Sequence, residues 1–281
     1  MKSLGERDEL RSTSSRGTRI LGGLSIVGVL FLGLAGLWWS PEDSDMGDLV
    51  RIMYVHVPSA WLAYMAFIIT AIGSVMFLWK RSVWWDLIAG ASAEIGVLFC
   101  ALALATGSLW GRPTWGTYWL WSDVRIVTTL VLLLMYAGYL ALRRVDGDPT
   151  QRSKRAAIVG LIAAANIPVV RYSVHWWSNR TLHQQDTVGL DTKLDNGPLF
   201  TLMLGLVVFT ILFAWMLLHR FRIAWLESET EHRGLEQALI ERRAEGRAKP
   251  ERLLEREATP ERLLERETKP ERTLGAAEVR P

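Results

Sequence analysis

Three of the five histidines lie between long apolar stretches of the chain, and each has tryptophan close by. His56 begins the sequence His-Val-Pro-Ser-Ala-Trp, while His175 and His183 lie on either side of a Trp-Trp pair. A single histidine at a membrane surface is more often plain polar surface. Two imidazoles from different segments on one face suit ligation of a heme iron from both sides, because neutral imidazole is a common axial ligand.

A dense aromatic run occupies residues 107–125, Gly-Ser-Leu-Trp-Gly-Arg-Pro-Thr-Trp-Gly-Thr-Tyr-Trp-Leu-Trp-Ser-Asp-Val-Arg. Membrane interfaces favour Trp and Tyr, which explains one or two such residues at the end of a span. It explains less well a run that is interleaved with glycine and followed by Asp123 and Arg125. A flat aromatic surface is what a porphyrin stacks on, so the predicted platform is Trp110, Trp115, Trp119 and Trp121.

Arginines near these segments are candidate partners for the carboxylates of a porphyrin, because a guanidinium binds a carboxylate bidentately. They are Arg51, Arg112, Arg125 and Arg171. Cys100, the only cysteine, lies in an apolar stretch, and no CxxC or CxxCH motif is present. Free cysteine usually behaves as a small buried apolar residue. The chain is therefore predicted to be neither a c-type cytochrome nor a thiol redox partner.

The elements that must position these residues are apolar helices. Half of the 281 residues are apolar and lie in long blocks almost free of charge, which is typical of membrane spans. About 20 helical residues cross the hydrocarbon core. The sequence predicts an all-α polytopic membrane protein with six transmembrane helices and a tryptophan-rich outward loop. The helices are expected at about Ile20–Trp39, Ala60–Trp79, Asp86–Leu109, Ile126–Leu142, Ala156–Val170 and Leu199–His219.

Lysine and arginine near the span ends predict the orientation. The set of segments that includes both termini is about twice as basic as the other set. Both termini are therefore expected in the cytoplasm of a bacterium, and loops 40–59, 110–125 and 171–198 face outward from its inner membrane. His219 and His232 then lie on the cytoplasmic side and cannot reach the outward site.

Three regions are expected: a cytoplasmic N-terminal segment (1–19), the six-helix domain (20–220) and a charged cytoplasmic tail (221–281). In the tail, Pro-Glu-Arg-Leu-Leu-Glu-Arg-Glu begins at Pro250, recurs at Pro260 and starts again at Pro270, a ten-residue period. Each proline would interrupt a helix, so the tail is predicted to form short helical turns or to be disordered. Its opposite charges nearly cancel, which argues against nucleic-acid binding.

Three residues at or within the spans have separate expectations. Glu94 lies inside the third span, where an ionisable group is costly and marks a functional candidate, or else hydrogen-bonds in protonated form within the bundle. Asp86 is expected to anchor the cytoplasmic end of that span. Pro58 is expected near the first position of the second helix, where its missing N–H costs nothing.

Three motifs carry a family resemblance. The stretch Trp110–Arg125 resembles the tryptophan-rich WWD signature of heme-handling proteins, and His56 to Trp61 resembles the His-Val-Pro-x-Ala-Trp element of the heme exporter protein C (CcmC) family. The segment that begins Asn166-Ile-Pro and ends Thr181-Leu-His-Gln184 resembles that family's third-loop element. The resemblance covers about residues 20–220 and includes the six-span topology.

This resemblance implies heme binding and delivery rather than enzymatic catalysis. The family holds heme b in transit at the outer face, between two axial histidines, and His56 and His183 fall on those positions. The tryptophans of the signature, with Asp123 and Arg125, would complete the site. The implied partners are the periplasmic heme chaperone CcmE, the ABC-type subunits CcmA and CcmB, the small CcmD and membrane lipid.

The chain departs from the family pattern in two places. Ser122 stands between the last tryptophan and Asp123, and extra residues near 178–180 precede Thr181, which keeps His175 as a substitute for His183. The alternatives within heme biology are a heme-lyase or synthetase subunit for cytochrome c assembly, and a diheme b-type electron-transfer protein. A polytopic permease with an aromatic binding loop is the alternative outside it.

Overall fold

The computed structural model describes residues 15–44, 47–183 and 194–257, and within these ranges the regular elements are helices. They run in the order α2 (Arg16–Leu34), the π-helical turn η1 (Ala35–Trp39), α3 (Val50–Lys80), α4 (Val83–Trp115), α5 (Val124–Leu142), α6 (Pro149–Ala164), α7 (Asn166–Trp176), the 3-10 turn η2 (Ser178–Arg180) and α8 (Asn196–Glu257). The chain divides into two compact units, Met1–Leu226 and Glu227–Pro281.

Six helical segments are long and apolar enough to cross a membrane. They are Arg16–Trp39, Val50–Lys80, Val83–Trp115, Val124–Leu142, Pro149–Trp176 and Asn196–Ala244. This confirms the predicted all-α, six-span architecture. The fifth segment consists of two helices, α6 and α7, that meet at Ala165.

The second span begins earlier than predicted. Helix α3 starts at Val50, so His56 lies on the helix and Pro58 lies inside it, not at its first position. A proline within a helix has no N–H for the carbonyl four residues earlier, here Tyr54. That carbonyl faces Gly205 of α8, where an added Cβ would lie only 3.2 Å from the oxygen. Tertiary packing thus accommodates a proline that local rules place at a helix start.

The third span ends later than predicted. Helix α4 continues to Trp115, with Pro113 inside it, and ends at Gly116 in the left-handed conformation (φ 78°). Trp110 and Trp115 therefore lie on the last turns of a helix rather than in a loop. The irregular part of the aromatic run is short, from Gly116 to Asp123.

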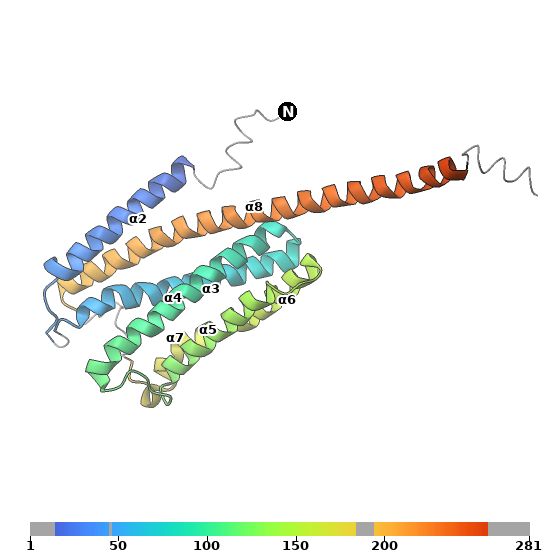
Figure 1. The fold of residues 1–281 in the computed structure, drawn as a ribbon. Coiled ribbons are helices and arrows are strands. Elements are labelled where there is room, and N and C mark those ends of the chain that lie inside the picture. The colour runs from blue at the N-terminus through green and yellow to red at the C-terminus, as the bar shows by residue number, and fades with distance from the viewer. Residues whose placement is uncertain (1–14, 45–46, 184–193, 258–281) are drawn as a thin grey trace, which may run out of the picture. The chain divides into compact units, whose positions relative to one another are not determined.

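Helices α3, α4, α5 and α6 of the first unit pack side by side (Figure 1). At their centre the rings of Phe67 and Tyr136 stack, with centroids 3.8 Å apart and planes 4° from parallel. Gly96 lets α4 approach this stack, because an added Cβ would lie 2.5 Å from the Phe67 ring. Both aromatic side chains are fully buried, so this part of the bundle is closely packed.

The acidic residues of α4 are paired with arginines of other helices. Asp86 is buried, binds both terminal nitrogens of Arg143 at 2.5 and 2.9 Å, and accepts a hydrogen bond from Ser153 at 2.9 Å. Glu94 binds Arg220 of α8 through both carboxylate oxygens. Asp86 and Glu94 thus each have an ion-pair partner that the sequence did not indicate. That Asp86 anchors the cytoplasmic end of the span stays a prediction.

Helix α8 extends into the second unit as far as Glu257. It continues through Pro250, so the prediction that this proline interrupts the helix is wrong. One proline removes one hydrogen-bond donor, which does not end the helix here. The repeats that begin at Pro260 and Pro270, like residues 1–14, lie outside the described residues.

Replacing Arg143 with glutamine should destabilise the bundle. The change leaves the buried Asp86 carboxylate without its counter-charge, and breaking a buried pair costs about 3–5 kcal/mol. We expect the detergent-solubilised R143Q protein to unfold at a clearly lower temperature than wild type. Arg144, exposed on the next position, provides the control variant R144Q. Equal unfolding temperatures for the two variants would contradict the structural role of the Asp86–Arg143 pair.

Candidate functional site

A cavity of about 560 Å³ lies among α3, α4, α5 and α7 in the first unit. Its size falls within the roughly 300–1,000 Å³ of ordinary small-molecule sites. Most of its wall is apolar, and the chemically distinctive residues that line it are His56, His183, Trp110, Trp115, Trp119, Arg125 and Arg171. Both predicted axial histidines therefore face one space, although they come from segments more than 120 residues apart.

His56 is held by α4. Its Nδ1 atom lies 3.0 Å from the Ala103 carbonyl oxygen and 3.1 Å from Thr106 Oγ1. A carbonyl can only accept, so Nδ1 carries the proton and Nε2 keeps its lone pair. The Thr106 hydroxyl donates to the Leu102 carbonyl at 2.8 Å, which leaves its own lone pair for the imidazole. Gly107 leaves room for the ring, because an added Cβ would lie 2.9 Å from His56 Cε1.

His183 lies on the irregular segment after η2. Its ring packs edge-on against Trp115, with centroids 5.1 Å apart. Its Nδ1 atom is buried and has no hydrogen-bond partner among the described residues. The nearest anion is Asp123 Oδ2 at 3.9 Å, which is too far for a hydrogen bond but close enough for electrostatic attraction. The second imidazole is therefore held less firmly than the first.

Asp123 ties the aromatic run to this third segment. Its buried carboxylate caps α5 by accepting from the Ile126 N–H at 3.0 Å, and it accepts from the Leu182 N–H at 2.7 Å. The Thr181 hydroxyl donates to it at 3.4 Å. Burial favours the neutral acid, but the neighbouring His183 and the two backbone N–H donors outweigh it and hold the pKa of Asp123 at about 2. Asp123, and not the exposed Ser122, thus makes the structural contacts at this position.

The tryptophans of the run form edge-on pairs. Trp110 and Trp115 meet at 86° with centroids 5.2 Å apart, and Trp119 and Trp121 meet at 66° with centroids 5.5 Å apart. Three of the four line the cavity, whereas Trp121 does not and is 74% exposed. The indoles therefore form the walls of a pocket rather than the single flat shelf that the sequence suggested.

Of the four candidate arginines, only Arg125 and Arg171 line the cavity. Arg51 pairs with Asp48 at 2.7 Å and donates to carbonyls at the end of the first span. Arg112 donates to the Gly116 carbonyl and lies over the Tyr118 ring. These contacts of Arg51 and Arg112 stabilise helix ends. The spacing of residues in the sequence cannot distinguish an arginine with that role from one that binds a ligand.

His175, the substitute ligand, is exposed on α7 and does not line the cavity. Its nearest ring neighbour is Tyr172, at 6.4 Å between centroids. Gln184 of the third motif lies outside the described residues. Among the three histidines that the sequence singled out, the structure thus brings His56 and His183 together and leaves His175 apart.

Sequence reasoning missed Thr106 and Ala103, which orient His56. No local signal could have revealed them, because their role depends on how α3 pairs with α4. The described residues also contain no cluster of three or more His, Cys, Asp or Glu side chains suited to a metal ion. A metal-containing ligand at this site would therefore depend on the two imidazoles.

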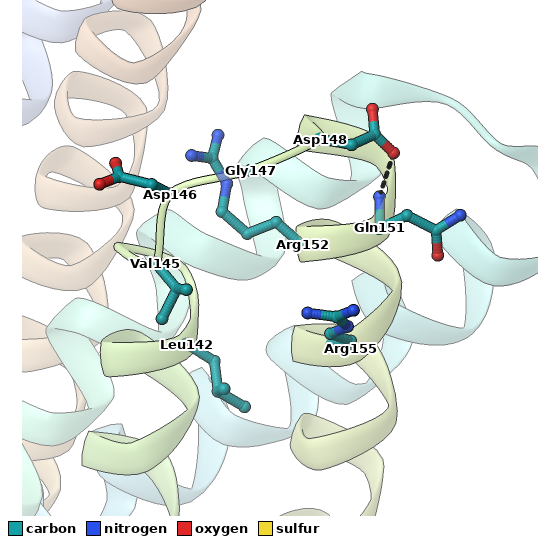
Figure 2. Close-up of a pocket in the computed structure, with 8 residues that line it drawn as sticks. All are labelled: Leu142, Val145, Asp146, Gly147, Asp148, Gln151, Arg152 and Arg155. Carbon is teal, nitrogen blue, oxygen red and sulfur yellow. Dashed lines mark hydrogen bonds between the residues drawn. The ribbon is translucent and has the colours of Figure 1, made fainter.

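A smaller cavity of about 210 Å³ lies at the turn between α5 and α6 (Figure 2). It is lined by Leu142, Val145, Asp146, Gly147, Asp148, Gln151, Arg152 and Arg155. Asp148 caps α6 by accepting from the Gln151 N–H at 2.9 Å. No histidine or aromatic side chain lines it, so it does not offer the chemistry of the larger cavity.

Comparison with known proteins shows the family of the chain. Residues 1–236 match the family described as CcmC, heme exporter protein C. The chain belongs to this CcmC family. The predicted resemblance is therefore confirmed, and the match covers every element that lines the cavity.

Curated CcmC relatives align over most of their length. Heme exporter protein C of Bradyrhizobium diazoefficiens is 41% identical over 209 residues, which are 73% of this chain and 78% of that protein. The Escherichia coli K12 protein of the same name is 33% identical over 222 residues, 78% of this chain and 89% of that protein. That of Rhodobacter capsulatus is 34% identical over 189 residues, 66% of this chain and 77% of that protein.

Replacing Asp123 with alanine should loosen the end of the bundle where α5 begins. The variant loses the cap of α5, worth about 1 kcal/mol, and leaves the Leu182 N–H without its acceptor, worth about 1–3 kcal/mol. We expect a lower unfolding temperature for the detergent-solubilised D123A protein and no change for S122A. If S122A were the more damaging substitution, Ser122 would hold the role assigned to Asp123.

Proposed function

We propose that this CcmC family member binds heme at the outer face of the bacterial inner membrane and delivers it to a periplasmic heme chaperone during cytochrome c maturation. The observation that supports this most directly is the convergence of His56 and His183 on one aromatic cavity. The heme exporter names of the relatives agree with it. Heme b is the cargo of this site rather than a permanent cofactor.

The residues of the cavity match the chemistry of heme. Both Nδ1 atoms turn toward the protein, toward Ala103 and Asp123, so both Nε2 atoms are available to the iron. Trp110, Trp115 and Trp119 offer apolar contact to the porphyrin. Two guanidinium groups, Arg125 and Arg171, line the same cavity and would supply partners for the two propionates.

The orientation follows from the distribution of basic residues. The cytoplasmic set of segments contains Arg143, whose ion pair with Asp86 lies near the start of α4, whereas the cavity residues of α4 lie toward its end. Both termini then face the cytoplasm, and the cavity opens toward the periplasm. From that side the protein would transfer heme to CcmE and work beside CcmA, CcmB and CcmD.

We propose a relay without catalysis. The chain would supply two ligands, aromatic walls and two cations, which bind and present the cargo. A permease with an aromatic loop would need none of the histidine pairing, and a diheme protein would need ligand pairs on facing helices at membrane depth. The alternative of a heme-lyase subunit shares the aromatic run but lacks support from the names of the relatives.

Absorption spectra test the ligand assignment. Protein purified from heme-replete cells should show a Soret band and the spectrum of six-coordinate bis-imidazole heme. H56A and H183A should each lose that spectrum, whereas H175A should keep it. A wild type without a Soret band would overturn the proposed function, and retention of an unchanged bis-imidazole spectrum in both H56A and H183A would overturn the ligand assignment.

Heme dimethyl ester tests the carboxylate contacts. Because a hydrogen bond to a charged group is worth about 1.5–3 kcal/mol, R125Q and R171Q should each weaken heme binding about ten- to a hundredfold. Neither should weaken binding of the ester, which has no free carboxylates. R112Q is the matched control, because Arg112 points elsewhere. Equal losses for heme and ester would contradict propionate recognition.

A further inference from the structure

The two candidate ligands are held in unequal ways. His56 lies on α3, and its Nδ1–H is shared between the Ala103 carbonyl at 3.0 Å and the Thr106 hydroxyl at 3.1 Å. Both acceptors belong to α4, and α3 and α4 pack against each other extensively. Moving the His56 ring would therefore require two packed helices to separate.

His183 has no comparable support among the described residues. Its Nδ1 atom is buried without a hydrogen-bond partner, 3.9 Å from the Asp123 carboxylate. Its side chain is 23% exposed and follows the exposed Leu182 on an irregular segment. The contacts of Thr181 hold only the backbone, since its hydroxyl accepts from the His183 N–H at 3.2 Å and donates to Asp123 at 3.4 Å.

We propose that His56 is the permanent ligand of the site and His183 the exchangeable one, so that heme is released on the His183 side. This inference rests on the proposed heme-binding function. It also assigns a role to Thr106, which would position His56 without touching the heme.

Hydrogen bonding explains why the two ligands differ in strength. A bond from Nδ1–H to an acceptor orients the ring and raises the basicity of Nε2, which strengthens its bond to a metal. His56 has that bond, and His183 has only a carboxylate beyond hydrogen-bond distance. In the exchange, the Nε2–iron bond of His183 breaks with its electron pair returning to nitrogen. An incoming donor supplies the replacing lone pair, and the oxidation state of iron does not change.

The exposure of the site indicates the side from which an incoming ligand approaches. That is the side where Leu182 and Trp121 lie, both of them exposed. The His56 side is unsuited to such an approach, because Gly107 of α4 lies against that ring.

Two matched threonine substitutions test the assignment in the full-length, heme-loaded protein in detergent. T106V removes the hydroxyl that accepts from the His56 ring. T181V removes the hydroxyl that holds the backbone of His183. The first readout is the rate at which cyanide replaces a histidine on ferric heme. The second is the iron–histidine stretching frequency that follows photolysis of the ferrous carbon monoxide complex, which reports the histidine that stays bound.

We expect T181V to speed cyanide substitution about three- to tenfold, as loss of one or two hydrogen bonds allows, and to leave the stretching frequency unchanged. T106V should lower the stretching frequency and leave the substitution rate unchanged. T106S and T181S, which keep the hydroxyl, should behave as wild type and so exclude effects of altered packing.

The opposite pattern, in which T106V speeds substitution and T181V shifts the frequency, would make His56 the exchangeable ligand. Equal responses of the two variants in both readouts would also overturn the assignment. Either result, obtained with a wild type that shows bis-imidazole heme, would leave the proposed function intact. A wild type without that spectrum would instead overturn the proposed function, and this inference with it.

Discussion

The end of the bundle that contains the candidate site depends on one buried carboxylate. Asp123 accepts from the first turn of α5 and from the backbone at Leu182, so it joins two segments that are nearly 60 residues apart in the chain. Without that link, neither helix propensity nor apolar burial would hold the segment of His183 beside Trp115, because the segment is irregular and its side chains are partly exposed. The carboxylate can do this because the neighbouring His183 and the two backbone N–H donors keep it ionised despite burial. A capping residue thereby also sets the geometry of the candidate site.

The apolar blocks were sufficient to predict the number of spans, since about 20 apolar residues have few alternatives to a transmembrane helix. Their ends were not predictable in the same way. Pro58 was expected near a helix start by local rules, yet it lies inside α3, and α4 likewise continues through Pro113. The candidate site was likewise predictable in part. The sequence was enough to select His56, His183 and the tryptophans as candidates. The contacts of Thr106, and which of the four arginines line the cavity, depend on which helices meet.

The ionisable groups of α4 obey the same constraint. Charges in an apolar environment require partners, and Asp86 and Glu94 of α4 find Arg143 and Arg220 on different helices. Their positions in the sequence marked them as unusual but could not separate a structural pair from a functional group. The pairing favours the structural role, because each carboxylate has both oxygens engaged by a guanidinium.

A site that must both hold and release its cargo has conflicting requirements. Rigid ligands on packed helices bind strongly because little ordering is needed at the moment of binding, but the same rigidity opposes transfer. In this fold a helix meets the requirement for tight binding, and an irregular segment meets the requirement for release. A helix carries His56 with its hydrogen bonds complete, and an irregular segment carries His183 with its Nδ1 just beyond reach of Asp123. Because Asp123 anchors the backbone next to His183 and not its ring, the second imidazole can leave without unfolding the link that places it.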